Sequence, residues 1–434
     1  MKTMENVLLM SCRSPYLDDA KVYPPLGILY LKAAVEQELP SVNIDIRDDY
    51  DLDDPSIFEP YDLIGISVMT PQREESLKIL NAVKTHYPDK KVAIGGPHAL
   101  HYFNDVMKEK YDYVIPKDGQ RSLVKILKGE GDRMEFDSMN AGEWANQPRP
   151  DRTSDKAREF LLSYHYNIKD RKAGTMLTAT GCPMVCTFCE DAGTTVRWSP
   201  LDKLKNEMDD LIGLGYSGVY LFDDLFAINM KKVEPIAHEL KKRDLIYRCN
   251  GQANFFTKWG DDFAKLLGET GCQEIAFGHE TGSQKILDNI NKKTLIEQNY
   301  RSVEYAKKHG IKVKSFLMIG LPGETMETIR ETERFIQTAG MDDFQLAIYY
   351  PYKGTKIRDA IDSGLDIQDL TFEKEGLGAY GQKGGKTESV VRTKALSSSD
   401  LLRIRDELVM KYQPKSHKMM WFHDTHLTSE SEYE

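Results

Sequence analysis

In the first third of the chain, short apolar segments alternate with longer segments whose apolar residues recur every three or four positions. The first pattern indicates buried strands, and the second indicates amphipathic helices. We expect strands at residues 7–10, 42–46, 63–68, 91–94 and 111–115, and helices at 24–38, 71–86, 101–108 and 120–127. This alternation predicts a doubly wound parallel sheet, which binds ligands outside the carboxyl ends of its strands.

The alternation weakens between residues 133 and 172. Pro148 and Pro150 indicate an extended connector, because proline disfavours helix both at its own position and at the residue before it. The run at 151–158 carries charges of both signs, so we expect it to form a solvated surface.

A second alternating region follows the connector. We expect strands at residues 175–180, 218–222, 246–249, 274–277, 313–319 and 344–348, and helices at 201–214, 231–242, 261–269, 283–291, 295–309 and 325–338. Six strands cannot close an ordinary eight-stranded barrel. We therefore expect a partial (β/α)6 barrel with its reactive groups at the carboxyl ends of the strands.

The last part of the chain is less regular. An amphipathic helix opened by serines is expected at 399–412, and the acidic end at 423–434 is expected to fray. Residues 376–386 contain five glycines, which suits either a substrate lid or a solvated connector. The predicted organisation is a sheet domain at 1–145, a linker at 146–172, the barrel at 173–355, and a helical and irregular C-terminal segment at 356–434.

Composition excludes several classes of protein. The net charge of −10 gives no basic field, so we expect neither nucleic acid nor an anionic membrane as a main partner. No apolar run is long enough to span a bilayer, and no N-terminal signal pattern is found. The six cysteines do not form a disulfide pattern, and Cys12, Cys249 and Cys272 are expected to be buried thiols. A reducing cytoplasm is the expected location.

The other three cysteines form the chain's strongest chemical signal. Cys182, Cys186 and Cys189 follow an apolar strand and share one short loop. Thiolates are the ligands of iron–sulfur clusters and zinc, and three ligands leave one iron of a four-iron cube open. A structural zinc site would need a fourth ligand and usually has a second cysteine pair, which this chain lacks.

This motif, with the aromatic Phe188 before its last cysteine, resembles the signature of the radical S-adenosylmethionine (SAM) enzymes. The resemblance implies a [4Fe–4S] cluster on Cys182, Cys186 and Cys189 that binds SAM through its open iron. It also implies that one electron from the cluster splits SAM into a 5′-deoxyadenosyl radical, with Phe188 near the adenine.

The predicted ends of the barrel strands are polar. They carry Asp223, Asp224, Gln252, Glu280 and Tyr349. By resemblance to the radical SAM barrel, the segment ending in Asp223 and Asp224 stands where the family grips the amino group of SAM, and the other three belong to the same cofactor site. In the alternative interpretation, the two aspartates cap the next helix and Glu280 pairs with a nearby lysine.

The strand ends of the first domain resemble those of the cobalamin-binding domain in B12-type radical SAM enzymes. The residues implied to contact the corrin are Ser67, Met69, Thr70, Gly95, Gly96 and His98. Two departures stand out: no Asp-x-His-x-x-Gly occurs, and residues 117–120 read Lys-Asp-Gly-Gln where relatives often carry Gly-Glu-Gly-Glu. We interpret His98 as a turn residue near the ligand rather than as a cobalt ligand.

The sequence therefore predicts a radical SAM enzyme, with cobalamin-dependent methylation of an unactivated carbon as its favoured reaction. A radical cyclisation, oxidation or rearrangement without methyl transfer is the alternative, and a non-catalytic thiolate metal-binding protein is the alternative of another class. The expected partners are a small-molecule or peptide substrate and an electron donor such as flavodoxin or ferredoxin.

Overall fold

The computed structural model describes residues 4–13, 21–374 and 389–413. These residues form two compact units, the first from 4–13, 21–176 and 197–217, and the second from 177–196, 218–374 and 389–413. The glycine-rich segment 376–386 and the acidic end 423–434 lie outside the described residues. The four-part domain division made from the sequence stays a prediction.

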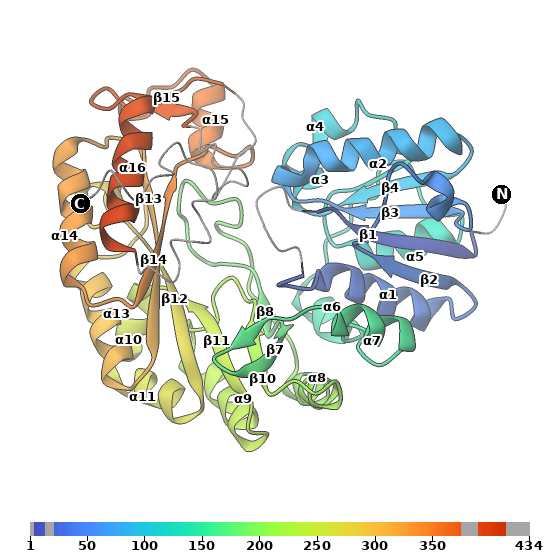
Figure 1. The fold of residues 1–434 in the computed structure, drawn as a ribbon, viewed down its shortest axis with the longest axis horizontal. Coiled ribbons are helices and arrows are strands. Elements are labelled where there is room, and N and C mark those ends of the chain that lie inside the picture. Colours follow the sequence, from blue (N-terminus) through green and yellow to red (C-terminus); the bar gives the residue numbers. More distant parts are fainter. Residues whose placement is uncertain (1–3, 14–20, 375–388, 414–434) are drawn as a thin grey trace, which may run out of the picture. The chain divides into compact units, whose positions relative to one another are not determined.

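The first unit contains a five-stranded parallel sheet in the order β2-β1-β3-β4-β5. Its strands are β1 (Asn6–Ser11), β2 (Asn43–Arg47), β3 (Leu63–Ser67), β4 (Lys91–Gly95) and β5 (Tyr113–Ile115). Helix α2 (Arg73–His86) covers one face, while α1 (Leu26–Glu38) and α5 (Gly119–Leu127) cover the other (Figure 1). The predicted doubly wound parallel sheet is thus confirmed.

The helix expected at 101–108 begins earlier. It is replaced by α3 (Pro97–His101) and α4 (Phe103–Val106), so His98 lies on a helix rather than in a turn. Gly96 precedes α3 with φ of +90°, and a side chain there would meet the backbone of Val68 at 2.8 Å. Proline then suits the first helical position because its missing N–H would be unpaired there anyway.

The rest of the first unit consists of short elements and one longer helix. They are the 3₁₀ turns Pro55–Phe58 and Thr70–Gln72, α6 (Ala141–Asn146), α7 (Asp155–Leu162), β6 (Asn167–Ile168), β7 (Arg171–Met176), β9 (Arg197–Trp198) and α8 (Leu201–Gly213). β6 and β7 are antiparallel. The expectation of a wholly solvated surface at 151–158 is wrong at Arg152, which is buried with its Nη2 2.7 Å from Glu207 Oε1.

The second unit contains the parallel strands of the predicted barrel, in the order β14-β13-β12-β11-β10. They are β10 (Gly218–Leu221), β11 (Ile246–Gly251), β12 (Cys272–Glu280), β13 (Lys312–Ile319) and β14 (Asp343–Ile348). The strand expected at 175–180 is interrupted, since β7 ends at Met176 and β8 (Ala179–Thr180) is separate. Parallel strands joined by helices confirm the predicted fold class.

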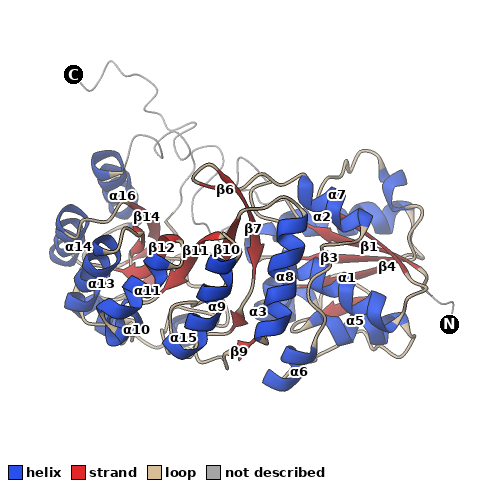
Figure 2. Ribbon diagram, turned by 90° about the horizontal axis from the view of Figure 1, so that it is seen from below, coloured by secondary structure: helices blue, strands red, loops and turns tan. Residues whose placement is uncertain are grey.

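Helices lie along the outer side of this sheet, where α9, α11 and α13 pack side by side (Figure 2). The helices of this unit are α9 (Met230–Lys242), α10 (Ala253–Trp259), α11 (Asp261–Glu269), α12 (Gln284–Asn289), α13 (Ile296–Lys308), α14 (Met326–Thr338), α15 (Lys356–Asp362) and α16 (Ser398–Tyr412). Two short strands, β15 (Thr371–Phe372) and β16 (Val391–Arg392), are antiparallel. The helix expected at 399–412 is confirmed, and α15 lies in the segment expected to be helical and irregular, whereas α10 was not expected.

His279 connects β12 by hydrogen bonds to the neighbouring strand β13 and to helix α13. Its ring nitrogens lie 2.8 Å from Ser315 Oγ and 3.0 Å from Ser302 Oγ. Burial lowers the pKa of His279 to about 3, so the ring is neutral. A neutral, fully hydrogen-bonded histidine here stabilises the sheet that positions the site.

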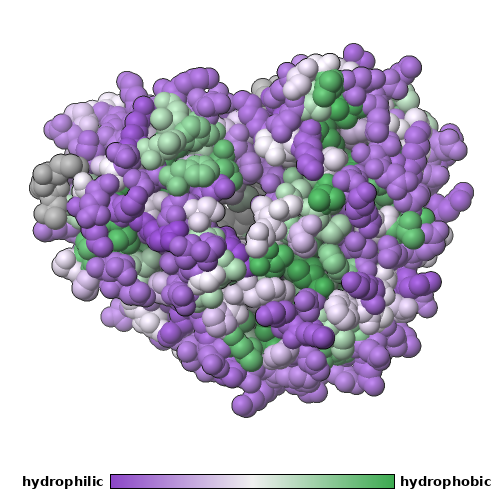
Figure 3. Space-filling view, turned by 180° about the vertical axis from the view of Figure 1, so that it is seen from behind, coloured by the Kyte–Doolittle hydropathy of each residue, from purple (hydrophilic) through white to green (hydrophobic). Residues whose placement is uncertain are grey.

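None of the helices in the described ranges combines the length and apolar character that a membrane crossing requires. Hydrophilic residues cover most of the face shown in Figure 3, and hydrophobic residues occur in separate patches. Cys12, Cys249 and Cys272 are buried free thiols, as expected from the sequence.

Candidate active site

The cysteine loop of the second unit begins with a turn that only glycine can form. Gly181 has φ of +92°, and a side chain there would lie 2.3 Å from Thr195 O. The next residue, Cys182, donates its backbone N–H to Thr194 Oγ1 at 2.8 Å. This hydrogen bond joins the start of the loop, at Cys182, to its end, at Thr194.

The middle of the loop is held by elements far away in the sequence. Thr187 donates its N–H to Ile290 O at 3.0 Å and accepts the N–H of Ile357 at 3.1 Å. Asn291 donates from its side chain to Val185 O at 3.0 Å. These bonds connect the segment around Cys186 to the turn after α12 and to the first turn of α15.

The three cysteines of the loop line a cavity of about 310 Å³, which lies toward the carboxyl ends of the parallel strands of the second unit. Its lining residues are Cys182, Met184, Cys186, Phe188, Cys189, Asp191, Asp224, Leu225, Asn250, Gly251, Gln252, Ala276, Gly278, Glu280, Lys292 and Phe316. The structure thus brings together all three predicted cysteines with Phe188, Asp224, Gln252 and Glu280. Asp223 and Tyr349 are not among the lining residues.

The donor set of this cavity suits an iron–sulfur cluster. Burial raises the pKa of all three loop thiols, that of Cys189 to about 12, so they are protonated at neutral pH until a metal binds. Within the described ranges, no group of three or more His, Cys, Asp or Glu side chains is arranged to hold a single metal ion. A four-iron cube is wider than one ion, so its thiolate ligands stand further apart.

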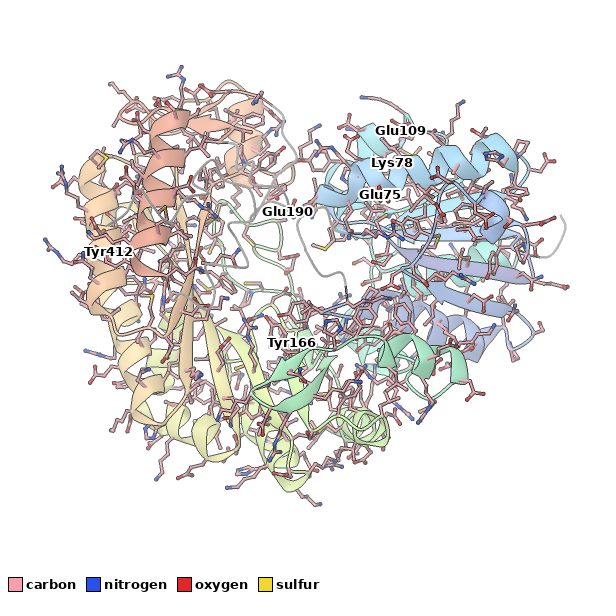
Figure 4. The ribbon with its side chains drawn as sticks, viewed as in Figure 1. Glu75, Lys78, Glu109, Tyr166, Glu190 and Tyr412 are labelled. Atoms are coloured by element: carbon pink, nitrogen blue, oxygen red, sulfur yellow. The ribbon has the colours of Figure 1, made fainter. Side chains whose placement is uncertain are left out.

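Acidic residues follow the third cysteine on the same loop. Glu190 is placed there in Figure 4, and burial together with the neighbouring Asp191 raises its pKa to about 7. Burial also raises the pKa of Asp191.

Glu280 and Lys292 bring opposite charges to the cavity. Lys292 Nζ lies 2.5 Å from Glu280 Oε1 and 5.7 Å from the centre of the Phe188 ring. Burial opposes the charge of Lys292, but Glu280, together with Cys186 and Cys189 in their thiolate forms, raises its pKa above the ordinary value. Glu280 thus pairs with a nearby lysine, as the alternative interpretation expects, and it also lines the cavity, so its contact with SAM stays a prediction.

The backbone around Glu280 is shaped for this contact. Glu280 itself has φ of +63°, a conformation that non-glycine residues adopt rarely. At Gly278 a side chain would lie 2.6 Å from Glu280 Oε1, so it would displace the Glu280 carboxylate. Sequence reasoning missed Lys292, although a lysine in the polar turn after α12 is the signal that could have found it.

The two aspartates after β10 have different surroundings. Asp223 is 1 % exposed, its carboxylate accepts the N–H of Thr178 at 2.6 Å, and burial raises its pKa to about 7. Asp224 accepts the N–H of Gly181 at 2.8 Å and lines the cavity. Neither caps α9, whose N-cap is Asn229.

Tyr349 and Gln252 complete the predicted residues of the second unit. Tyr349 is packed in the hydrophobic core, and burial raises the pKa of its hydroxyl well above the usual range. Gln252 lies at the N-cap of α10 and donates to Lys292 O at 3.3 Å. Direct contact of Asp223 or Tyr349 with SAM stays a prediction.

The predicted cobalamin residues of the first unit lie at the ends of β3 and β4. Met69 is 56 % exposed, whereas Thr70 is buried. His98 is buried and stacked on Tyr102 with ring centres 5.0 Å apart. Ser67 pairs with Gly95 in the sheet, where a side chain on Gly95 would meet only ordinary contacts. Roles for these six residues, Gly96 included, stay predictions.

The residues at 117–120 make a contact that the sequence did not suggest. Asp118 forms an ion pair with Arg197, at 2.7 Å from its Nη1, and accepts the N–H of Met139 at 2.8 Å. Arg197 also lies 4.8 Å from the centre of the Trp144 ring. The departure from the family pattern at Asp118 thus serves a structural contact within this unit.

Two family models match successive parts of the chain. The B12 binding domain matches residues 19–127, and the Radical SAM superfamily matches residues 176–336, which include the cysteine loop and the strands around the cavity. The chain thus carries the two domains of the cobalamin-binding radical SAM enzymes. The family's cofactors are a [4Fe–4S] cluster, SAM and cobalamin.

Curated relatives of the chain include a methyltransferase and a cyclase. An uncharacterised methyltransferase of Pyrococcus horikoshii is 26 % identical over 77 % of this chain and 77 % of its own length. The anaerobic magnesium-protoporphyrin IX monomethyl ester cyclase of Rubrivivax gelatinosus is 23 % identical over 81 % of this chain and 68 % of its own length.

A solved structure shows the same fold. It is that of the radical SAM methyltransferase TsrM of Kitasatospora setae with cobalamin and a [4Fe–4S] cluster bound. It has 18 % identity and a TM-score of 0.64, and the match covers 85 % of this chain and 80 % of TsrM.

Proposed function

We propose that this enzyme is a methyltransferase that transfers a methyl group to an unactivated carbon of its substrate. The observation that carries the proposal is the pairing of a B12 binding domain with a cysteine-lined cavity that also holds an ion pair. When bound, the cluster with SAM supplies a hydrogen-abstracting radical, and cobalamin supplies the methyl group. A relative that is a methyltransferase supports this reaction.

The chain's own residues would bind and orient SAM beside the cluster. Cys182, Cys186 and Cys189 hold the cluster. Lys292 offers a positive charge to the carboxylate of SAM, and Glu280 and Asp224 offer negative charge to its ammonium group and acceptors to its hydroxyls.

Apolar side chains would keep water away from the reacting groups. Met184, Phe188, Leu225 and Phe316 line the same cavity as the charged residues. A cavity wall of this kind lowers the local dielectric, which strengthens the contacts of Lys292 and excludes water from a reactive intermediate.

The proposed partners follow from the chemistry. A low-potential electron donor such as flavodoxin or ferredoxin would reduce the cluster, and the substrate is a small molecule or a peptide. With a net charge of −10, nucleic acid is not the proposed substrate. The reducing conditions that an open iron needs favour the cytoplasm.

The test is anaerobic reconstitution of the full chain with iron, sulfide and hydroxocobalamin, followed by reduction and analysis of the products of SAM. We expect both 5′-deoxyadenosine and S-adenosylhomocysteine, because hydrogen abstraction gives the first and methyl donation gives the second. If 5′-deoxyadenosine forms alone, the reaction is a radical cyclisation, oxidation or rearrangement instead. If SAM is not cleaved and no iron is retained, the protein is a non-catalytic thiolate metal-binding protein.

A further inference from the structure

The cysteine loop is attached to the end of β10 by two adjacent carboxylates. The N–H of Thr178 donates to one carboxylate oxygen of Asp223, and the hydroxyl of Thr178 donates to the other. Asp224 accepts the N–H of Gly181. The two aspartates therefore hold residues on either side of β8, immediately before Cys182.

Both carboxylate oxygens of Asp223 accept a hydrogen bond from Thr178. Asp223 and Thr178 are both buried, and Asp223 does not line the cavity that its neighbour Asp224 reaches. Both aspartates follow the last residue of β10, and of the two only Asp224 lines the cavity.

The backbone of Asp223 is fixed from the neighbouring strand. Asn250 donates from its side chain to Asp223 O at 3.1 Å and accepts the hydroxyl of Tyr220 at 3.2 Å. Arg248 lies 4.6 Å from the centre of the Tyr220 ring and pairs with Glu274 at 2.8 Å. This network leaves Asp223 little freedom to turn toward a ligand.

We infer that Asp223 is a positioning residue, which acts through Thr178 to set the place of Cys182, and that it does not bind SAM. The inference rests on the proposed function only in that the loop carries the cluster. It assigns the two aspartates different tasks, since Asp224 both holds Gly181 and faces the cavity.

The variant Asp223→Asn distinguishes a positioning role of Asp223 from a role in binding SAM. The asparagine keeps an oxygen that accepts the N–H of Thr178, and its amide can donate to the Thr178 hydroxyl, so positioning survives. A residue that binds the SAM ammonium by charge would lose that contact in the same variant. Asp223→Ala removes both roles.

The first readout is the alkylation rate of Cys182 by iodoacetamide in the full-length apoprotein, followed by mass spectrometry. We expect Asp223→Ala to raise this rate about tenfold, which corresponds to about 1.4 kcal/mol of lost hydrogen bonding. Asp223→Asn should stay close to the parent protein. The buried Cys249 is the internal control, because its protection shows that β11 remains folded.

The second readout is a double-mutant cycle with Thr178→Val, which removes the hydroxyl and keeps the shape. If Asp223 acts through Thr178, combining Asp223→Ala with Thr178→Val should do no more than Asp223→Ala alone. Fully additive effects would overturn the inference.

The third readout is SAM affinity of the reconstituted protein. If Asp223→Asn weakens SAM binding as much as Asp223→Ala while its Cys182 alkylation and iron content stay normal, Asp223 binds SAM and the inference is wrong. Failure of methyl transfer would not affect the alkylation result, so the two proposals fail separately.

Discussion

Lys292 and Glu280 form a buried ion pair at 2.5 Å inside the cavity that the three cluster cysteines line. Their side chains are 7 % and 9 % exposed, although they come from different segments of the chain. A buried charge that loses its partner is costly, and a pair that faces a cavity can also serve a charged ligand.

We expect Lys292→Met to destabilise the protein by about 3–5 kcal/mol, because Glu280 is left buried without its counter-charge. Combining it with Glu280→Gln should restore most of the stability, while SAM affinity measured by equilibrium dialysis stays at least about tenfold weaker. The exposed neighbour Lys293 provides the matched control, and Lys293→Met should leave both quantities unchanged. Normal SAM affinity in the double variant would exclude this pair from the SAM site.

The cysteines of the loop should differ sharply from the buried thiols elsewhere. Cys182→Ala, Cys186→Ala or Cys189→Ala leaves only two protein ligands, so each should abolish the brown visible absorbance and all SAM cleavage. Cys249→Ala and Cys272→Ala should retain the cluster and cost about 1 kcal/mol of stability. Loss of the cluster in Cys249→Ala with retention in Cys186→Ala would contradict the ligand assignment.

Glu324 gives a pH-dependent prediction. Its buried carboxylate accepts the N–H groups of Gly320 and Leu321 at 2.7 and 3.2 Å, and burial raises its pKa from 4.5 to about 7. The folded state therefore holds its proton more tightly than the unfolded state, and the resulting stability is lost as pH rises from about 4.5 to about 7.

Glu324→Gln removes this titration. Relative to the glutamine variant, the parent protein should lose roughly 2–3 kcal/mol between pH 4.5 and 7, since each pKa unit corresponds to about 1.4 kcal/mol. Thermal unfolding of both proteins at several pH values measures the difference. A constant difference in Tm would show that Glu324 does not titrate in this range.

Arg152 and Glu207 form a buried pair in the first unit. Arg152→Ala should cost about 3–5 kcal/mol, because Glu207 is left buried and charged. The control is Arg149→Ala, which breaks an ion pair with Asp210 at a 41 % exposed arginine and should cost less than about 1 kcal/mol. Equal shifts in unfolding midpoint for the two variants would contradict this ranking.

Cobalamin should bind without a histidine ligand from His98, because that ring is buried and stacked on Tyr102. We expect hydroxocobalamin to be retained after desalting with a base-off spectrum, both in the parent protein and in His98→Ala. A base-on or histidine-ligated spectrum that disappears in His98→Ala would refute this. No retained cobalamin, with SAM still cleaved, would favour the radical reaction without methyl transfer.

The sequence predicted features that depend on local periodicity or on short spacing. Strands such as β3 and β13 were found within about a residue because their apolar patterns are local. The three cysteines were found because one short loop carries all of them.

Contacts between distant segments were not predictable in the same way. The polar neighbours of Arg152 in the sequence indicate a surface position. Its ion-pair partner, Glu207, lies 55 residues further along the chain. At Asp223 and Asp224 the sequence shows two carboxylates after a strand, but which of them faces the cavity depends on the backbone path beyond the end of β10. Only the folded chain decides that.

The bonds around Thr187 have a consequence for the order of events during synthesis. Thr187 is held by Ile290 and Ile357, which leave the ribosome long after the cysteines. A nascent chain that ends before α15 contains every thiol of the loop but not the backbone partners that shape it. The loop can therefore take up its finished shape only after residue 357 has been synthesised, well after its three cysteines.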